Sequence, residues 1–284
     1  MGFLTYDVNR FTPQQLVALP LILFVASLAV LGYNVATTGM PVQPGIEFAG
    51  GTGVTIFTTD TKAQIESYFA GDPLNSVEGG ISDGWYLTFA PMSTEARDAL
   101  TAKIAERYPD PIVNNIEPTF ASSLQVQALY ALVLSFVGMS IVVFVAFRRL
   151  IPSFAVVSCA FADIVVTAAI MSLLGITLSL GTTAALLMLI GYSVDSDILL
   201  TTRVLKRKGR LDEKLAGAFH TGIIMTTTTL AAIAAMWIVA TIGQVQIVAE
   251  IAAVLLIGLA VDIANTWLTN VGVLKWFLER RASR

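Results

Sequence analysis

Two aspartates interrupt an apolar stretch near the middle of the chain, and their type and position suit proton chemistry. Asp195 and Asp197 follow an apolar run that begins at residue 184, and the nearest basic residues come later, in the cluster 203–210. An ionised aspartate at membrane depth costs about 2.5–3.5 kcal/mol, even on a lenient insertion scale. Two such residues are therefore a candidate functional site.

The spacing of the two aspartates places them on different faces of a helix. Two positions along an α-helix rotate the side chain by about 200°. Asp195 then shares its face with Tyr192, and Asp197 shares its face with Ser193 and Thr201, whose hydroxyls can satisfy it. We expect one aspartate to face the bundle of this chain and the other to face a seam with a partner.

Three further polar residues in apolar segments are candidates for the same proton relay. Asp163 falls near the middle of its segment, Asp262 in the inner half of the last segment, and His220 close to one end of its segment. A histidine side chain titrates near neutral pH and can carry protons. Structural interpretations stay open: Asp262 could form a hydrogen bond between helices, and His220 could bind a backbone carbonyl. Asp195 is the preferred candidate.

The elements that position these residues are membrane-spanning helices. The chain is 55% hydrophobic and 13% charged, whereas soluble domains carry about 25% charged residues. A helix that crosses a bilayer needs about 20 mostly apolar residues. Six segments fit this requirement: 15–36, 124–147, 151–174, 182–202, 219–241 and 247–271. We predict an α-helical integral membrane protein with six transmembrane helices, the last five within 124–271.

The distribution of basic residues predicts the orientation. Residues 40–123 hold four of the seventeen Lys and Arg residues. The others lie at Arg10, at Arg148 and Arg149, and in 203–214 and 275–284, and six spans place all four regions on one side. Cytoplasmic loops carry the excess of Lys and Arg. We therefore expect a cell-membrane protein with cytoplasmic termini, 1–14 and 272–284, and an external segment, 37–123.

The external segment has the pattern of a small folded domain. Strands are predicted at 53–58, 76–81, 85–89 and 112–120, and helices at 61–70 and 93–107. Ser82, Asp83 and Gly84 form a hairpin turn signal, and Thr61 and Ser93 are predicted N-caps. The order β-α-β-β-α-β predicts a ferredoxin-like α+β domain. The domain lacks His and Cys, so we expect no metal site and no nucleophilic dyad there.

Several glycines have predicted structural roles. The stretch at 45–52 precedes a strand and lacks the Gly-Lys-Ser/Thr of a phosphate loop. Its local interpretation is a tight connector that needs positive φ angles. Glycines inside the spans are predicted to be contact points between helices: Gly138, Gly191, Gly222 and Gly258.

Two ordered motifs and the topology together resemble the SecF branch of the SecD/SecF protein-export family, in its archaeal form. The first motif comprises Gly45, Glu47, Phe48, Gly50, Gly51 and Thr52. The second comprises Gly191, Tyr192 and Ser193, with Arg203 at the end of the same helix. The resemblance covers essentially the whole chain. Asp195 also aligns with the aspartate in the Val-Asp-Ala-Asn motif of SecD.

The resemblance implies an auxiliary role in protein export and no enzymatic activity or cofactor. Members pair with SecD into a unit of the resistance-nodulation-division superfamily, which uses proton movement to help polypeptides leave a SecYEG-type channel. The expected partners are SecD, that channel, the exported polypeptide and the lipid bilayer, with no nucleic acid. Bacterial members use an arginine in the fifth span, and its approximate counterpart here is His220.

Other functions remain open at this stage. The chain could be a non-transporting scaffold that stabilises SecD. An intramembrane aspartyl protease would also use aspartates on neighbouring helices, in Tyr-Asp and Gly-x-Gly-Asp motifs. Here Asp163 follows Ala162, and Asp195 follows Ser193 and Val194, so neither aspartate stands in such a motif. A small-molecule exporter of the same superfamily is a further alternative. Such exporters are usually about twice as long or longer and have two large external domains, whereas one external domain is predicted here.

Overall fold

A computed structural model describes residues 11–79, 84–243 and 245–282. It contains four strands, β1 (Gly51–Phe57), β2 (Leu74–Gly79), β3 (Gly84–Phe89) and β4 (Ile112–Ile116). The helices are α1 (Pro13–Thr38), α2 (Ile46–Ala49), α3 (Lys62–Tyr68), α4 (Thr94–Arg107), α5 (Pro118–Phe147), α6 (Leu150–Leu173), α7 (Leu180–Lys206), α8 (Leu211–Ile242), α9 (Gln246–Ala264) and α10 (Val271–Ala282). A π-helical segment, η2 (Asn265–Asn270), joins α9 to α10.

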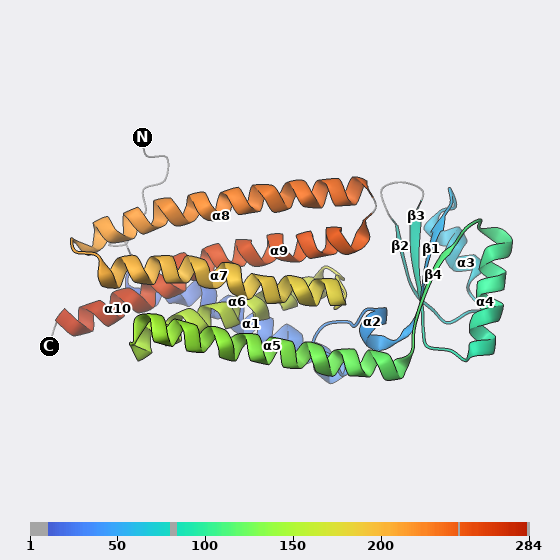
Figure 1. Cartoon of the computed structure of the whole chain (residues 1–284), viewed down its shortest axis with the longest axis horizontal. Helices are drawn as coiled ribbons and strands as arrows, with labels where there is room; N and C mark the ends of the chain where they lie inside the picture. The colour runs from blue at the N-terminus through green and yellow to red at the C-terminus, as the bar shows by residue number, and fades with distance from the viewer. Residues whose placement is uncertain (1–10, 80–83, 244, 283–284) are drawn as a thin grey trace.

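Among the described residues, six helices are long and apolar enough to cross a membrane, the last of them running from Gln246 through η2 to Arg280. They form one bundle, and the small α/β domain lies at one end of it (Figure 1). Helix α10 and the α5–α6 and α7–α8 connections lie at the other end (Figure 1). The predicted architecture, six spans plus an α+β domain between the first two, is confirmed.

The sheet of the α/β domain has the order β2-β3-β1-β4, and every neighbouring pair is antiparallel. This order, with α3 and α4 as the connections, is the ferredoxin-like arrangement that the sequence predicts. Alternate residues of the strands face one side, as the period of two requires. Val54, Ile56 and Leu87 are buried there with Ile65 of α3 and Ile104 of α4.

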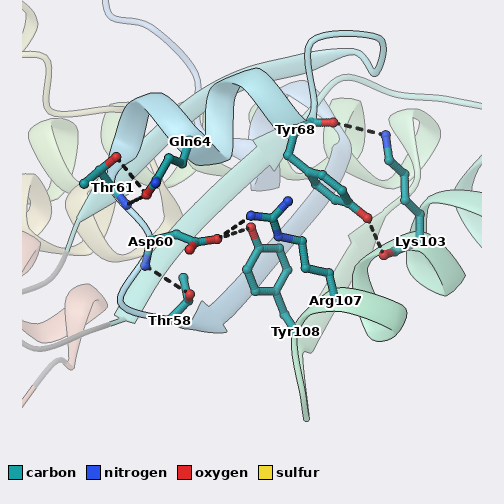
Figure 2. Close-up of polar contacts among 8 residues, drawn as sticks. All are labelled: Thr58, Asp60, Thr61, Gln64, Tyr68, Lys103, Arg107 and Tyr108. Atoms are coloured by element: carbon teal, nitrogen blue, oxygen red, sulfur yellow. Dashed lines mark hydrogen bonds and ion pairs between the residues drawn. The ribbon is translucent and has the colours of Figure 1, made fainter.

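Polar contacts tie α3 and α4 together beside the sheet (Figure 2). Asp60 accepts hydrogen bonds from the Arg107 guanidinium at 2.9 Å and from the Tyr108 hydroxyl at 3.1 Å. The Arg107 guanidinium also lies 4.4 Å from the centre of the Tyr68 ring, a cation–π contact. The Tyr68 hydroxyl donates to the Lys103 carbonyl at 3.2 Å. These contacts fix the two helices on one face of the sheet.

The glycine-rich stretch is the joint between the α/β domain and the bundle. Gly50 and Gly51 have φ angles of +75° and +130°, which confirms the predicted need for positive φ. The Gly45 amide donates to the Leu178 carbonyl at 2.8 Å, in the α6–α7 connection. Gln125 of α5 donates its side-chain amide to the Phe48 carbonyl. Thr52 is buried, with its hydroxyl 3.1 Å from the side-chain amide of Asn115.

Several predicted boundaries are wrong. The strand predicted at 112–120 ends at Ile116, because α5 begins at Pro118 and proline favours the first helical position. Helix α8, Leu211–Ile242, contains the fifth span predicted at 219–241 and extends beyond it at its start. The hairpin turn includes Ser82 and Asp83, which lie outside the described residues. Ser93 is confirmed as an N-cap, since its side chain accepts from the Ala96 amide, and Thr61 forms a capping box with Gln64.

The glycines in the spans divide into two kinds. A Cβ added to Gly222 would collide with the Trp267 ring, and one added to Gly258 would collide with Leu189. These two glycines are contact points between helices, as predicted. Gly138 and Gly191 have no neighbour within 4 Å of such a Cβ, so the prediction is wrong for them within this chain.

Candidate functional site

Three carboxylates from three spans gather inside the bundle. Asp163 of α6 and Asp197 of α7 are 0% exposed, and Asp262 of α9 is 1% exposed. The three helices pack against one another around an apolar cluster that includes Val156, Leu189 and Leu255. The structure therefore brings three of the five predicted relay residues into one buried cluster.

Asp163 is held by neutral donors from two other elements. The Ser193 hydroxyl donates to Asp163 Oδ2 at 2.5 Å, and the Asn265 amide donates to Asp163 Oδ1 at 2.6 Å. Ser193 belongs to the Gly-Tyr-Ser motif of α7 and lies one turn before Asp197, so both residues face the same interior. A single carboxylate thus links α6 to α7 and to η2.

Asp197 and Asp262 share one hydroxyl. Thr266 Oγ1 lies 3.0 Å from Asp197 Oδ1 and 3.1 Å from Asp262 Oδ1. The Asn270 amide also donates to Asp197 Oδ1, at 2.7 Å. The second carboxylate oxygens, Asp197 Oδ2 and Asp262 Oδ2, are buried and have no hydrogen-bond partner among the described residues. The cluster therefore contains acceptor atoms that its own donors leave unsatisfied.

The π-helical segment supplies most of the donors. Asn265, Thr266 and Asn270 all belong to η2 and are all buried. The Val271 amide lies within bonding reach of the Thr266 carbonyl, the i→i+5 relationship of a π-helix. Such segments occur frequently at functional sites, where they interrupt a long helix. Here the interruption lies beside the carboxylates, at the point where three polar side chains meet them.

Asp195 lies apart from this cluster. It is on the exposed face of α7, whereas Asp197 is fully buried, as the 200° rotation predicts. Asp195 and Arg203 line a surface groove of about 570 Å³ with apolar neighbours such as Leu199 and Met225. The buried carboxylates and the exposed one therefore occupy two separate environments.

His220 and Arg203 also lie away from the buried cluster. His220 is exposed on α8, and the Arg203 guanidinium donates to the Gly217 carbonyl, where it links α7 to α8. In the described ranges, the three carboxylates accept hydrogen bonds from side-chain hydroxyls and amides. No group of side chains in those ranges has a metal-binding arrangement.

Sequence reasoning missed Asn265, Thr266 and Asn270. With Asp262 they form a polar stripe at spacings of three, four and eight residues in a span that is mostly apolar. These spacings put polar residues on one side of a helix. The spacing of these residues is a signal in the sequence, but neutral amides and hydroxyls in a span indicate a site less strongly than charged residues do.

Comparisons with known proteins agree with this architecture. A family model described as "Protein export membrane protein SecD/SecF, C-terminal" matches residues 97–280. A protein named "Protein-export membrane protein SecF" from Methanolacinia petrolearia is 56% identical over 280 residues, covering 99% of both chains. Relatives of the same name from Haloferax volcanii and Pyrococcus furiosus are 42% and 37% identical, covering 95% and 96% of this chain and 94% and 93% of theirs.

A solved structure has the same fold. It is described as SecDF, a translocon-associated membrane protein from Thermus thermophilus, with a TM-score of 0.74 and 21% identity. The match covers 93% of this chain and 38% of the longer one. The family model covers well over half of the chain, and the archaeal relatives match it along nearly their whole length. The chain therefore belongs to the SecF branch of the SecD/SecF family of multi-pass membrane proteins.

Proposed function

We propose that the chain is an auxiliary subunit of the Sec protein-export machinery, acts with SecD, and helps exported polypeptides leave a SecYEG-type channel. The names of its relatives and their full-length similarity support this role. The Thermus thermophilus protein is much longer than its matched part. In this proposal, a separate SecD subunit takes the place of the unmatched part of that longer chain.

We propose further that the buried cluster of Asp163, Asp197 and Asp262 couples this work to proton movement. The arrangement around Thr266 is the observation that carries the proposal. A hydroxyl has one proton to donate, yet Thr266 Oγ1 is within hydrogen-bond distance of two carboxylates. It donates to one of them, and the other contact is favourable only when that carboxyl carries a proton and donates it to Thr266.

The electrostatics of the cluster support the same conclusion. Burying a charge without a counter-charge is costly, and neighbouring carboxylates in an apolar setting disfavour joint ionisation. The hydroxyl and amide donors around Asp163, Asp197 and Asp262 are neutral. Protons would therefore neutralise part of the cluster, and their arrival and departure would change which donors each carboxylate accepts.

In this proposal Asp195 has a different task. It lies on the exposed face of α7, beside a groove that also contains Arg203. A charged side chain facing lipid is costly, so a partner helix that covers this groove would stabilise it. Asp195 is thus proposed to contribute to the seam with SecD, and Asp197 to the relay inside this chain.

The proposed orientation follows from the basic residues at one end of the bundle. The basic connections α5–α6 and α7–α8 lie at the end opposite the α/β domain (Figure 1). If that end is cytoplasmic, as the excess of Lys and Arg there predicts, the α/β domain is external. It would then stand where exported polypeptides emerge.

The central experiment compares Asp197→Asn with Asp195→Asn in the complex with SecD. Proton flux is measured in vesicles, and export of a secreted reporter is measured in cells. We expect Asp197→Asn to abolish proton flux and to reduce export strongly, while Asp195→Asn keeps proton flux and weakens co-purification with SecD. Asp98→Asn, at an exposed position on α4, is the control.

Two outcomes would contradict parts of the proposal. If Asp197→Asn leaves both proton flux and export unchanged while the complex stays intact, the relay is excluded and a scaffold role is favoured. If Asp195→Asn abolishes proton flux and Asp197→Asn does not, the relay runs along the exposed face of α7. Both variants must be recovered from the membrane at wild-type levels for the comparison to hold.

A further inference from the structure

A second groove lies at the end of the bundle opposite the α/β domain. It has a volume of about 630 Å³ between the first turns of α1 and α6 and the start of α10. Its walls are apolar: Val17, Leu150, Ile151, Phe154, Val273 and Trp276. Leu150 and Phe154 are 75% and 74% exposed, so the groove opens to the surroundings of the bundle.

Helices α1 and α10 are in close contact where they line this groove. A Cβ added to Gly272 of α10 would lie 2.8 Å from Val17 Cγ2 and 3.1 Å from the Pro13 carbonyl of α1. The two helices therefore touch at Gly272, with no space for another side chain. At the same end, Lys275 Nζ donates to the Phe11 carbonyl at 3.0 Å. The groove therefore lies beside helices that are packed in direct contact with each other.

The rim of the groove is positively charged. Residues 11–17, 148–154 and 272–280 carry four basic residues and one carboxylate, Glu279. Arg148 and Arg149 are exposed and immediately precede Leu150 in the wall. Neither of them belongs to an ion pair within the described ranges. A group that binds beside the α5–α6 connection therefore meets two uncompensated guanidinium groups.

Trp276 indicates the depth of the rim in a bilayer. Its ring forms part of the groove, and the Arg280 guanidinium lies 5.1 Å from the ring centre. Tryptophan is enriched at the level of the lipid headgroups. The apolar walls therefore begin at headgroup level and extend toward the hydrocarbon core, while the arginines remain among the headgroups.

We propose that this groove binds an anionic phospholipid, with a hydrocarbon chain along the apolar walls and the phosphate beside Arg148 and Arg149. Guanidinium groups recognise phosphate through charge-assisted, often bidentate, hydrogen bonds. Basic pockets between transmembrane helices are known to bind anionic headgroups. The charge of the rim selects an anionic lipid over a zwitterionic one, which the apolar walls alone would not distinguish.

The test uses the full chain, alone and co-purified with SecD, in phosphatidylcholine bilayers that contain a minority of phosphatidylglycerol. Each lipid is supplied in turn with a photoactivatable group in its acyl chain, and labelled peptides are mapped by mass spectrometry. We expect phosphatidylglycerol to label the groove preferentially. Arg148→Gln combined with Arg149→Gln should reduce this labelling by about 30-fold, given the contribution of two near-surface cations, and leave phosphatidylcholine labelling unchanged.

Matched variants separate this site from general attraction to the membrane. Arg207→Gln combined with Lys208→Gln removes the same charge from the α7–α8 connection at the same end, where both residues are exposed. This control should keep preferential labelling of the groove. Val273→Trp should fill the groove and reduce labelling by both lipids. Equal labelling by the two lipids, equal loss in both double variants, or loss of labelling when SecD is present would each overturn the proposal.

Discussion

The Asn265 side-chain amide donates a 2.6 Å hydrogen bond to Asp163 Oδ1 and so joins the last span to the third. Ser193 of the fourth span binds the other oxygen of the same carboxylate. Three of the six spans therefore meet at one buried side chain. Asp163 is then a structural junction as well as a candidate proton carrier, and its partners determine both properties.

Asn265→Leu should destabilise the bundle. Leucine has about the size of asparagine but offers no donor, so a buried Asp163 oxygen would lose its partner. Leaving a buried polar group unsatisfied costs about 1–3 kcal/mol, and we expect a lower thermal unfolding midpoint in detergent. Ser140→Ala is the control, because the Ser140 hydroxyl donates to the Phe136 carbonyl of its own helix and so joins no two spans. A midpoint equal to that of the control would show that this bond adds nothing.

Thr266→Val should separate proton coupling from folding. Valine keeps the branched shape of threonine but removes the hydroxyl between Asp197 and Asp262. We expect proton flux with SecD to fall while the protein remains folded. Thr266→Ser restores the hydroxyl and should recover the flux. Equal fluxes in the two variants would rule out a part for the shared hydroxyl.

The spans and the external domain were predictable because their patterns are long and repeated. Apolar runs of about 20 residues have few alternatives in a folded chain, and the β-α-β-β-α-β order leads to one common sheet. The start of α5 at Pro118 was not predicted, because residues 112–116 have the composition of a strand and the boundary depends on one proline. Local composition identifies the element but not its last residue.

Only part of the candidate site was predictable from the sequence. The rotation between Asp195 and Asp197 follows from helix geometry, and the structure confirms it. Which of the two faces the interior depends on packing against α6 and α9, which the sequence of α7 does not contain. The π-helical turn at Asn265–Asn270 is similarly a tertiary feature, since a six-residue change of period leaves no clear pattern.

Alkaline titration should report the Tyr108 contact in the α/β domain. Burial, and then the hydrogen bond to Asp60, raise the pKa of Tyr108 to about 12. Because the folded state holds the phenol proton more tightly than the unfolded state, this stabilisation is present below about pH 10 and is lost as pH rises toward 12. Tyrosinate absorbance of the wild type minus that of Tyr108→Phe should give a midpoint near the raised pKa. A midpoint near that of free tyrosine would show that the contact does not persist in solution.

Gly258→Val should disrupt the packing of α9 on α7. A Cβ at this position collides with the Leu189 side chain, and Leu189 is fully buried in the same apolar cluster. Overpacking of this kind costs about 1–3 kcal/mol, and a displacement of α9 would also move Asp262 away from Asp197. We therefore expect Gly258→Val to lower both the thermal midpoint and the proton flux. Gly138→Val is the control, because a Cβ added there has no described atom within 4 Å apart from its own local helix backbone. If Gly138→Val impairs the isolated chain as much as Gly258→Val does, the effect comes from β-branching within a helix and not from contact between spans.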